Sequence, residues 1–124
     1  MDSIVKAKAD SFSNRIINMY KHLRNVHREY VMSVQVLRSG TSIGANIAES
    51  RYAQSDLDFI NKLSIALKEA NETCYWLNCL EKGNFIERRG FLSMQKDATE
   101  LIKILTSAIK TKKKNMAMTA NKQQ

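Results

Sequence analysis

Two glycines among small polar residues are the first feature of the sequence that could do chemistry. Gly40 and Gly44 lie in the segment LRSGTSIGANIAES, residues 37–50. Such glycines can form a loop that binds phosphate, but that loop follows a strand and commonly precedes a Lys-Ser/Thr pair. No strand pattern precedes Gly40, and Ala45 and Asn46 follow Gly44. The sequence therefore does not support a phosphate-binding loop.

Basic residues are concentrated in the last third of the chain, where they could bind a polyanion. The net charge is +8, of which residues 1–80 carry +2 and residues 81–124 carry +6. This asymmetry suits nucleic acid before a membrane surface. The alternative is a solvated helix end followed by a frayed tail. The residues that we expect to contact phosphates are Arg88, Arg89, Lys110, Lys112, Lys113 and Lys114.

No arrangement of side chains predicts catalysis, a metal site or another cofactor. His22 and His27 are five residues apart and do not share a helix face as ligands at i and i+4 would. Cys74 and Cys79 lie on different sides of one expected helix, so we expect small, mostly buried thiols without a disulfide. We therefore expect a protein that is not an enzyme.

The spacing of apolar residues predicts four helices. The chain contains no proline, where average usage would give about six, and this favours long helices joined by short turns. Apolar residues alternate at spacings of three and four from Val5 to Leu23, from Ile60 to Leu77 and from Phe91 to Ala108. A fourth helix runs through the glycines. We predict an all-α fold, an up-down-up-down four-helix bundle.

Several residues mark the expected helix ends. Ser55 followed by Asp58 is typical of a capping box, and Gly83 with Asn84 is typical of a helix stop. The first break is expected near residues 25–28. Gly90 stands where a good helix former is expected and leaves the start of the last helix open. The predicted domain is a bundle over residues 1–114, followed by a frayed or disordered tail over residues 115–124.

The glycines also form a ridge of small residues on their helix. Gly40, Gly44 and Ala48 are spaced at i, i+4 and i+8. Each glycine in a helix costs about 1 kcal/mol relative to alanine. Close approach of another backbone can offset that cost through dispersion contacts. We expect this helix to be packed on two sides, by its own bundle and by a second subunit.

Charged and aromatic residues near this ridge have two interpretations. The charged ones form an ion-pair network that fixes subunit register, or they are ordinary solvated charges. Tyr75 and Trp76 stack on exposed RNA bases, or they anchor a core or an interface, which is the commoner use. The residues that we assign to oligomer or helix packing, besides the ridge, are Arg38, Glu49, Lys68, Glu69, Glu72 and Trp76.

Two central blocks of the sequence carry a family resemblance. QVLRSGTSIGANIAES (35–50) and DFINKLSIALKEANETCYWLNCL (58–80) closely resemble the bacterial four-helix-bundle proteins named for intervening sequences in 23S ribosomal RNA genes. Weaker agreement extends over most of residues 3–112. Members carry a ribosomal-protein label that reflects gene location more than activity. The resemblance implies an up-down four-helix bundle, similar to the accessory protein of diversity-generating retroelements, a basic homopentamer that binds nucleic acid and a reverse transcriptase.

These observations together predict the function. We expect a homo-oligomer, a pentamer by the resemblance, that binds ribosomal or other structured RNA through basic surface. The alternative is a protein-binding adaptor or scaffold for a neighbouring enzyme, with no direct role in nucleic-acid binding. No apolar run reaches the roughly 20 residues of a membrane span, and the start MDSIVKAKADS has no signal-peptide core. We therefore expect a cytoplasmic protein with no membrane partner.

Overall fold

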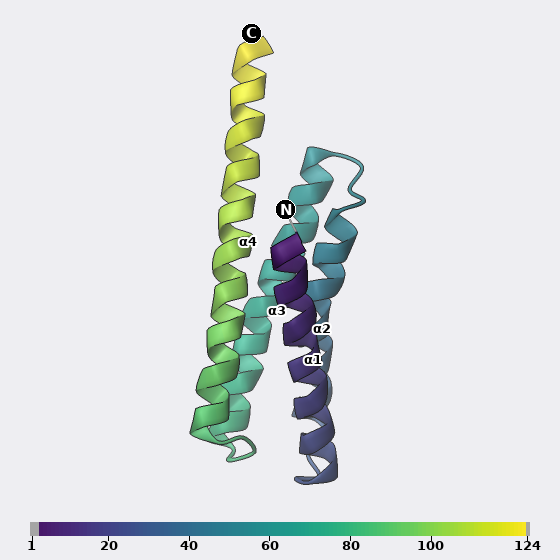
Figure 1. The fold of residues 1–124 in the computed structure, drawn as a ribbon, viewed down its shortest axis with the longest axis vertical. Coiled ribbons are helices and arrows are strands. Elements are labelled where there is room, and N and C mark those ends of the chain that lie inside the picture. Colours follow the sequence, from purple (N-terminus) through teal and green to yellow (C-terminus); the bar gives the residue numbers. More distant parts are fainter. Residues whose placement is uncertain (1–2, 124) are drawn as a thin grey trace.

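The computed structural model describes residues 3–123 and shows four antiparallel helices (Figure 1). They are α1 (Ser3–Asn25), α2 (Met32–Ser50), α3 (Asp56–Lys82) and α4 (Arg88–Gln123). Short connections join each helix to the next, so the chain runs up, down, up and down. Within residues 3–123 there is no strand. The structure confirms the predicted all-α four-helix bundle.

The core follows the predicted apolar seams in the first and last helices. All of the α1 residues in this core are at most 2% exposed, and those of α4 are at most 8% exposed. Burial on this scale is the main favourable term in folding. The residues are Val5, Ala9, Phe12, Ile16, Leu23, Phe91, Met94, Ala98, Leu101, Leu105 and Ile109.

The buried face of α3 differs from the seam that the spacing predicts. Ile60, Leu67 and Cys74 of that seam are only half-buried. α3 packs against both α2 and α4, so its apolar face is broader than the single seam of a helix with one neighbour. The buried residues of α3 are Leu63, Ala66, Ala70, Thr73, Leu77 and Leu80.

The first and last helices meet mainly through long polar side chains. Contact between α1 and α4 is the least extensive of the helix–helix contacts. Lys8 Nζ lies 2.5 Å from Glu100 Oε1, and Arg15 Nη1 lies 2.5 Å from Asp97 Oδ2. Arg15 also donates to Ser93 Oγ at 2.9 Å. These side chains bridge α1 and α4 across the least extensive helix–helix contact.

The contact between α1 and α2 is close because of Gly40. A Cβ atom at this position would lie 2.7–2.9 Å from three side-chain carbons of Ile16, which is fully buried. A Cβ at Gly44 would lie 3.4 Å from Ser13 Oγ, an ordinary contact distance. The small-residue ridge therefore packs within one chain at Gly40 and Gly44, whereas Ala48 is exposed.

A buried carboxylate organises the connection between α1 and α2. Glu29 is 8% exposed and accepts hydrogen bonds from the backbone N–H groups of Val31 (3.1 Å), Met32 (3.1 Å) and Ser33 (2.6 Å). These are free donors at the start of α2, where negative charge is favourable. Burial raises the pKa of Glu29, but the backbone hydrogen bonds outweigh it and lower the pKa below its ordinary value of 4.5.

The ends of α3 have the predicted signals, with one change of residue. Asp58 N donates to Ser55 Oγ at 3.0 Å, and Gln54 N donates to Asp58 Oδ2 at 3.2 Å. At the other end, Asn84 rather than Gly83 has the left-handed conformation, with φ of 63°. Phe85 N then donates to Leu80 O at 2.9 Å, which closes a Schellman-type stop.

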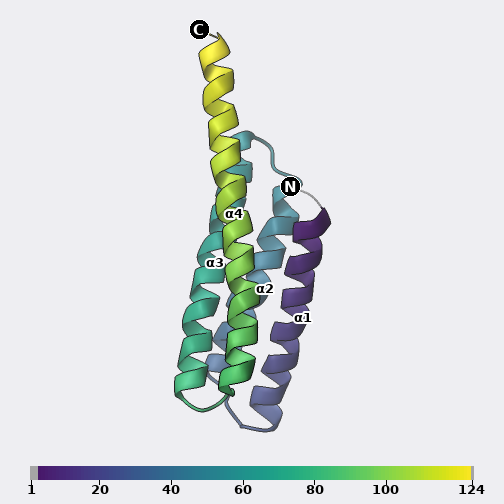
Figure 2. The ribbon, with the colours of Figure 1, turned by 60° about the vertical axis from the view of Figure 1, so that its left-hand side comes forward.

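The last helix begins at Arg88 and includes Gly90. A Cβ at Gly90 would meet nothing within 4 Å, so no packing contact requires glycine there. At the other end α4 extends beyond the rest of the bundle (Figure 2). Residues 115–123 belong to this helix, and their described side chains are exposed except for half-buried Met116.

Replacing Gly40 by alanine is expected to separate α1 from α2. The added methyl overlaps the branched Ile16 side chain, and the strain outweighs the gain in helix propensity. We expect a loss of about 1–2 kcal/mol in the free energy of unfolding, measured by urea denaturation. Gly44→Ala is the matched control and should be neutral or stabilise by up to about 1 kcal/mol. Equal stability of Gly40→Ala and wild type would contradict this account.

Replacing Glu29 by glutamine is expected to destabilise the protein in a pH-dependent way. The folded-state pKa of Glu29 is lowered, so its charge stabilises the fold above the ordinary pKa and that contribution is lost as the pH falls through the folded-state value. We expect Glu29→Gln to cost about 1 kcal/mol at neutral pH and much less near pH 3. Thermal unfolding at both pH values measures this. A constant difference would show that the charge does not matter.

Candidate nucleic-acid interface

The six basic residues predicted to bind phosphates do not form one cluster. Arg88 and Arg89 begin α4 at one end of the bundle. Lys110 to Lys114 lie toward the other end, where α4 passes the start of α3 (Figure 1). From Arg88 to Lys110 the helix rises about 33 Å. The predicted set therefore spans the bundle instead of forming a compact site.

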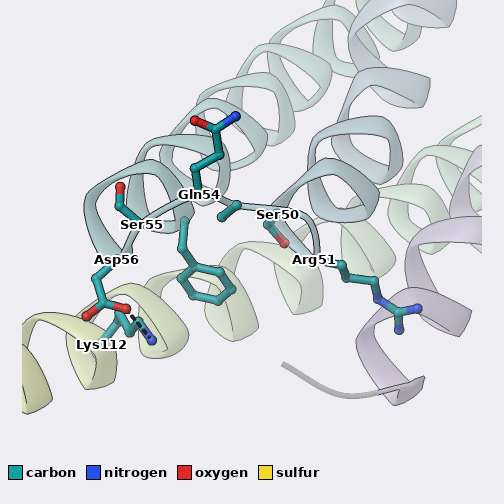
Figure 3. A pocket seen from close by; sticks show the side chains of 8 residues that line it. Ser50, Arg51, Gln54, Ser55, Asp56 and Lys112 are labelled. Carbon is teal, nitrogen blue, oxygen red and sulfur yellow. Dashed lines mark ion pairs between the residues drawn. The ribbon is translucent and has the colours of Figure 1, made fainter.

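Two of the six residues are engaged within the chain. Arg88 Nη1 lies 3.5 Å from Glu81 Oε1, and its guanidinium stacks over the Phe91 ring. Lys112 Nζ lies 2.9 Å from Asp56 Oδ1 (Figure 3) and 5.1 Å from the centre of the Phe59 ring. These contacts tie α4 to α3. They leave Arg89, Lys110, Lys113 and Lys114 as the exposed cations of the predicted set that form no ion pair among residues 3–123.

The exposed side of α4 carries a line of basic residues that the prediction only partly included. We call it the basic stripe and define it as Arg89, Lys96, Lys103, Lys110 and Lys114. The first four are seven residues apart and the last follows four residues later, so all five lie within about 60° of the helix circumference. All five side chains are exposed. Lys113 lies on the flank of the stripe.

The stripe is placed by the core on the opposite side of the same helix. Leu101 and Leu105 face α3 and α1 and are at most 1% exposed. Burying this face turns the positions half a turn away toward solvent. The sequence prediction did not include Lys96 and Lys103 because neither has a basic neighbour in the sequence. The seven-residue spacing of basic residues would have revealed them.

Most acidic side chains form ion pairs with residues outside the stripe. No acidic residue follows Glu100 in the sequence, and Glu100, the acidic residue beside the stripe, is paired with Lys8 at 2.5 Å. No stripe residue belongs to an ion pair among residues 3–123. The acidic residues that form ion pairs are Asp10, Glu49, Asp56, Glu69, Glu72, Glu81, Asp97 and Glu100.

This arrangement concentrates positive potential along one helix. Adjacent stripe charges are separated by about 10 Å along the axis, which is close to the Debye length in about 0.1 M salt. Their fields therefore add over the length of the stripe. A ligand with regularly spaced negative charges can interact with several of them at once, whereas a single small anion meets only one.

The predicted ion-pair network forms within one chain. Arg38 Nη1 lies 3.1 Å from Glu69 Oε2, and the other guanidinium nitrogen pairs with Glu72. Trp76 Nε1 donates to the same Glu72 oxygen at 3.0 Å, and the indole is half-buried. This group joins α2 to α3. It shows that three predicted partners and Trp76 meet without a second subunit.

The other two charges assigned to that network lie apart from it. Glu49 Oε2 is 3.1 Å from Lys62 Nζ, a second link between α2 and α3. Lys68 is exposed and belongs to no ion pair among residues 3–123. The contacts of Arg38 and Glu49 account for the register of α2 against α3. Their role between subunits stays a prediction.

Two cavities of the bundle are lined by polar and charged side chains. One of about 450 Å³ lies between the α2–α3 connection and α4, where Lys112 is paired with Asp56 and Arg51 points away from that pair (Figure 3). Another, of about 690 Å³, is bordered by His22 and His27. Their rings are in edge contact, with centres 5.0 Å apart.

Neither a cluster of metal-ligating side chains nor a membrane-spanning helix is found among residues 3–123. Between residues 3 and 123, no group of three or more His, Cys, Asp or Glu side chains is placed to hold a metal ion. Cys74 and Cys79 are free and half-buried, and burial raises the pKa of the Cys74 thiol. No helix in the described part of the chain is long and apolar enough to cross a membrane.

The fold of a solved structure of a similar protein agrees with this bundle. A crystal structure of a protein of unknown function from the S23 ribosomal protein family of Bacteroides thetaiotaomicron is 57% identical to the chain, with a TM-score of 0.85. The match covers 86% of this chain and 98% of that one. No curated protein matches the chain.

The match to a family model identifies the group of proteins. The model described as 23S rRNA-intervening sequence protein matches residues 1–107, which include α1, α2, α3 and α4 as far as Ser107. This range contains both central blocks of the sequence and, apart from Ile109, the whole core. The chain therefore belongs to the 23S rRNA-intervening sequence protein family.

Proposed function

We propose that the protein is a non-enzymatic RNA-binding protein that contacts phosphate groups through the basic stripe of α4. The observation that carries this proposal is the set of five exposed cations on one helix face, none of them in an ion pair among residues 3–123. Lysine and arginine contacts to phosphates supply affinity that is largely independent of sequence. Arg88 and Lys112 have structural partners and are not part of this interface.

Ribosomal or another structured RNA is the proposed partner. The family description refers to 23S rRNA, and the similar crystal structure is assigned to a ribosomal protein family. These names describe related proteins and support, by analogy, an RNA partner for this chain. The positive potential of α4 supplies the physical reason, because it matches a polyanion.

The proposed assembly is a homo-oligomer, with a pentamer as the expected form. The support within this chain is the outer face of α2, where small and apolar residues lie beside the paired charges of Arg38 and Glu49. Val34 is 44% exposed there, Tyr52 just beyond the helix is 85% exposed, and Ala45 and Ala48 are exposed between them. Small and apolar residues on such a face suit packing against a second subunit.

A protein-binding adaptor is the second candidate, and the α1–α2 connection favours it. Val26, Tyr30 and Val31 are 63%, 51% and 74% exposed. Arg24 lies over the rings of Tyr20 and Tyr30, with its guanidinium carbon 5.3 and 4.9 Å from their centres. Exposed apolar residues beside a stacked arginine are typical of protein interfaces. This end of the bundle is separate from the middle of the basic stripe.

Removing two stripe charges is expected to weaken RNA binding and its dependence on salt. We expect Lys103→Gln with Lys110→Gln to reduce affinity for a structured RNA about tenfold in about 0.1 M salt. The slope of log affinity against log salt should fall in magnitude by about 2. Binding through two fewer phosphate contacts releases about two fewer counterions from the RNA. Fluorescence anisotropy across a salt series measures both quantities.

Two controls distinguish the effect of stripe position on RNA binding from the effect of net charge. Lys21→Gln with Lys68→Gln removes two exposed lysines from α1 and α3 and should change affinity little. Exchanging two neighbours, Lys110→Thr with Thr111→Lys, keeps the composition but moves one charge about 100° around α4. It should weaken binding as much as Lys110→Thr alone. If all these variants bind alike, the stripe is not the interface.

A charged residue on the outer face of α2 is expected to break the oligomer. Ala48 is exposed within the chain, so Ala48→Arg leaves the bundle core intact. We expect the particle mass to fall to that of a monomer or dimer, measured by light scattering, with an unchanged helical circular dichroism spectrum. Gly44 is unsuitable for this test because it packs on α1. A mass unaffected by Ala48→Arg would place the subunit contact elsewhere.

A further inference from the structure

We infer that the basic stripe binds double-helical nucleic acid in preference to single strands. The inference rests on the proposed RNA-binding function and deepens it by naming the form of the ligand. It follows from three properties of the stripe: the kind of side chain it contains, the absence of stacking groups beside it, and its straight geometry on one helix.

The stripe offers cations but no surface on which a base can stack. Phe91 is the single aromatic residue of α4, and it is 5% exposed with Arg88 over its ring. The exposed tyrosines Tyr30, Tyr52 and Tyr75 lie in the α1–α2 connection, in the α2–α3 connection and on α3. Proteins that bind single strands combine a basic groove with aromatic side chains that stack on successive bases. α4 lacks the second component.

Lysine side chains suit phosphates more than base edges. Four of the five stripe residues are lysines, whose ammonium groups act as point charges on flexible stems. They can reach phosphate oxygens without a fixed approach direction. Base recognition commonly uses planar donors such as arginine, or amides held in one geometry. The stripe therefore recognises the charge of the backbone.

The charges lie along a straight line of fixed length. From Arg89 to Lys114 the helix rises about 38 Å, and its core face holds most of that length against α3 and α1. A duplex is also a stiff rod with closely spaced phosphates, about one charge per 1.7 Å of axis in DNA. Two preorganised partners lose little conformational entropy on binding. A flexible single strand would have to be straightened along α4 without stacking to compensate.

The test compares the full-length protein with three labelled probes in a salt series. They are an RNA hairpin with a stem long enough to span the stripe, a DNA duplex of the stem sequence, and a single-stranded RNA of equal length without self-complementarity. We expect at least one duplex to bind about tenfold more tightly than the single strand. The two duplexes distinguish RNA from DNA as the natural source of the helix.

A designed variant tests the physical reason for that preference. Ser107 is exposed and lies between Lys103 and Lys110 along α4. Ser107→Trp adds one stacking group beside the stripe and should raise single-strand affinity about tenfold while changing duplex affinity little. Ser107→Ala is the matched control and should change neither. Circular dichroism and thermal unfolding confirm that each variant is folded.

The possible outcomes separate this inference from the proposed function. A single strand bound as tightly as both duplexes by wild-type protein would overturn the duplex preference and leave RNA binding intact. Failure to bind any probe at low salt would overturn both. A duplex preference that depends on Lys103 and Lys110, lost in Lys103→Glu with Lys110→Glu but kept in Lys21→Glu with Lys68→Glu, would establish it.

Discussion

The distance between α1 and α2 is set by a contact between a side chain and a backbone. Ile16 lies directly against Gly40, at a distance that leaves no space for a Cβ atom. The helix accepts the propensity cost of glycine because the closer approach adds dispersion contacts along the whole pair. Once α1 and α2 are close, α3 packs across α2, and α4 packs on α3. Ion pairs of long polar side chains bridge α1 and α4.

The distribution of paired charges follows from this order of packing. Lys8 and Arg15 reach across the α1–α4 seam to Glu100 and Asp97. Arg38 and Lys62 link α2 to α3, while Arg88 and Lys112 link α3 to α4. Most of the acidic side chains thus form ion pairs at the helix interfaces. The outer side of α4 keeps its cations unpaired within the described chain, and these are the charges that a polyanion would meet.

Helix starts and stops show how local chemistry and burial combine. Ser55 and Asp58 cap α3 through contacts that any isolated chain could form. Glu29 differs because its carboxylate is buried and satisfies three backbone donors at once. In the sequence, neither the residue type nor the position of Glu29 distinguishes it from an ordinary surface charge. Only the turn formed at Arg28, with φ of 53°, brings it under the start of α2.

The sequence by itself determined the helices, their order and most of the core, because the spacings of three and four fix one apolar face per helix. It also located the excess of positive charge. Tertiary structure decided which cations are free, since Arg88 and Lys112 meet the acidic side chains of Glu81 and Asp56 on α3, and Asp56 lies far from Lys112 in the sequence. It also decided that Gly40 packs against α1 and not against a second subunit. Periodicity specifies which side of a helix is buried, but the identity of the neighbour depends on how all four helices pack.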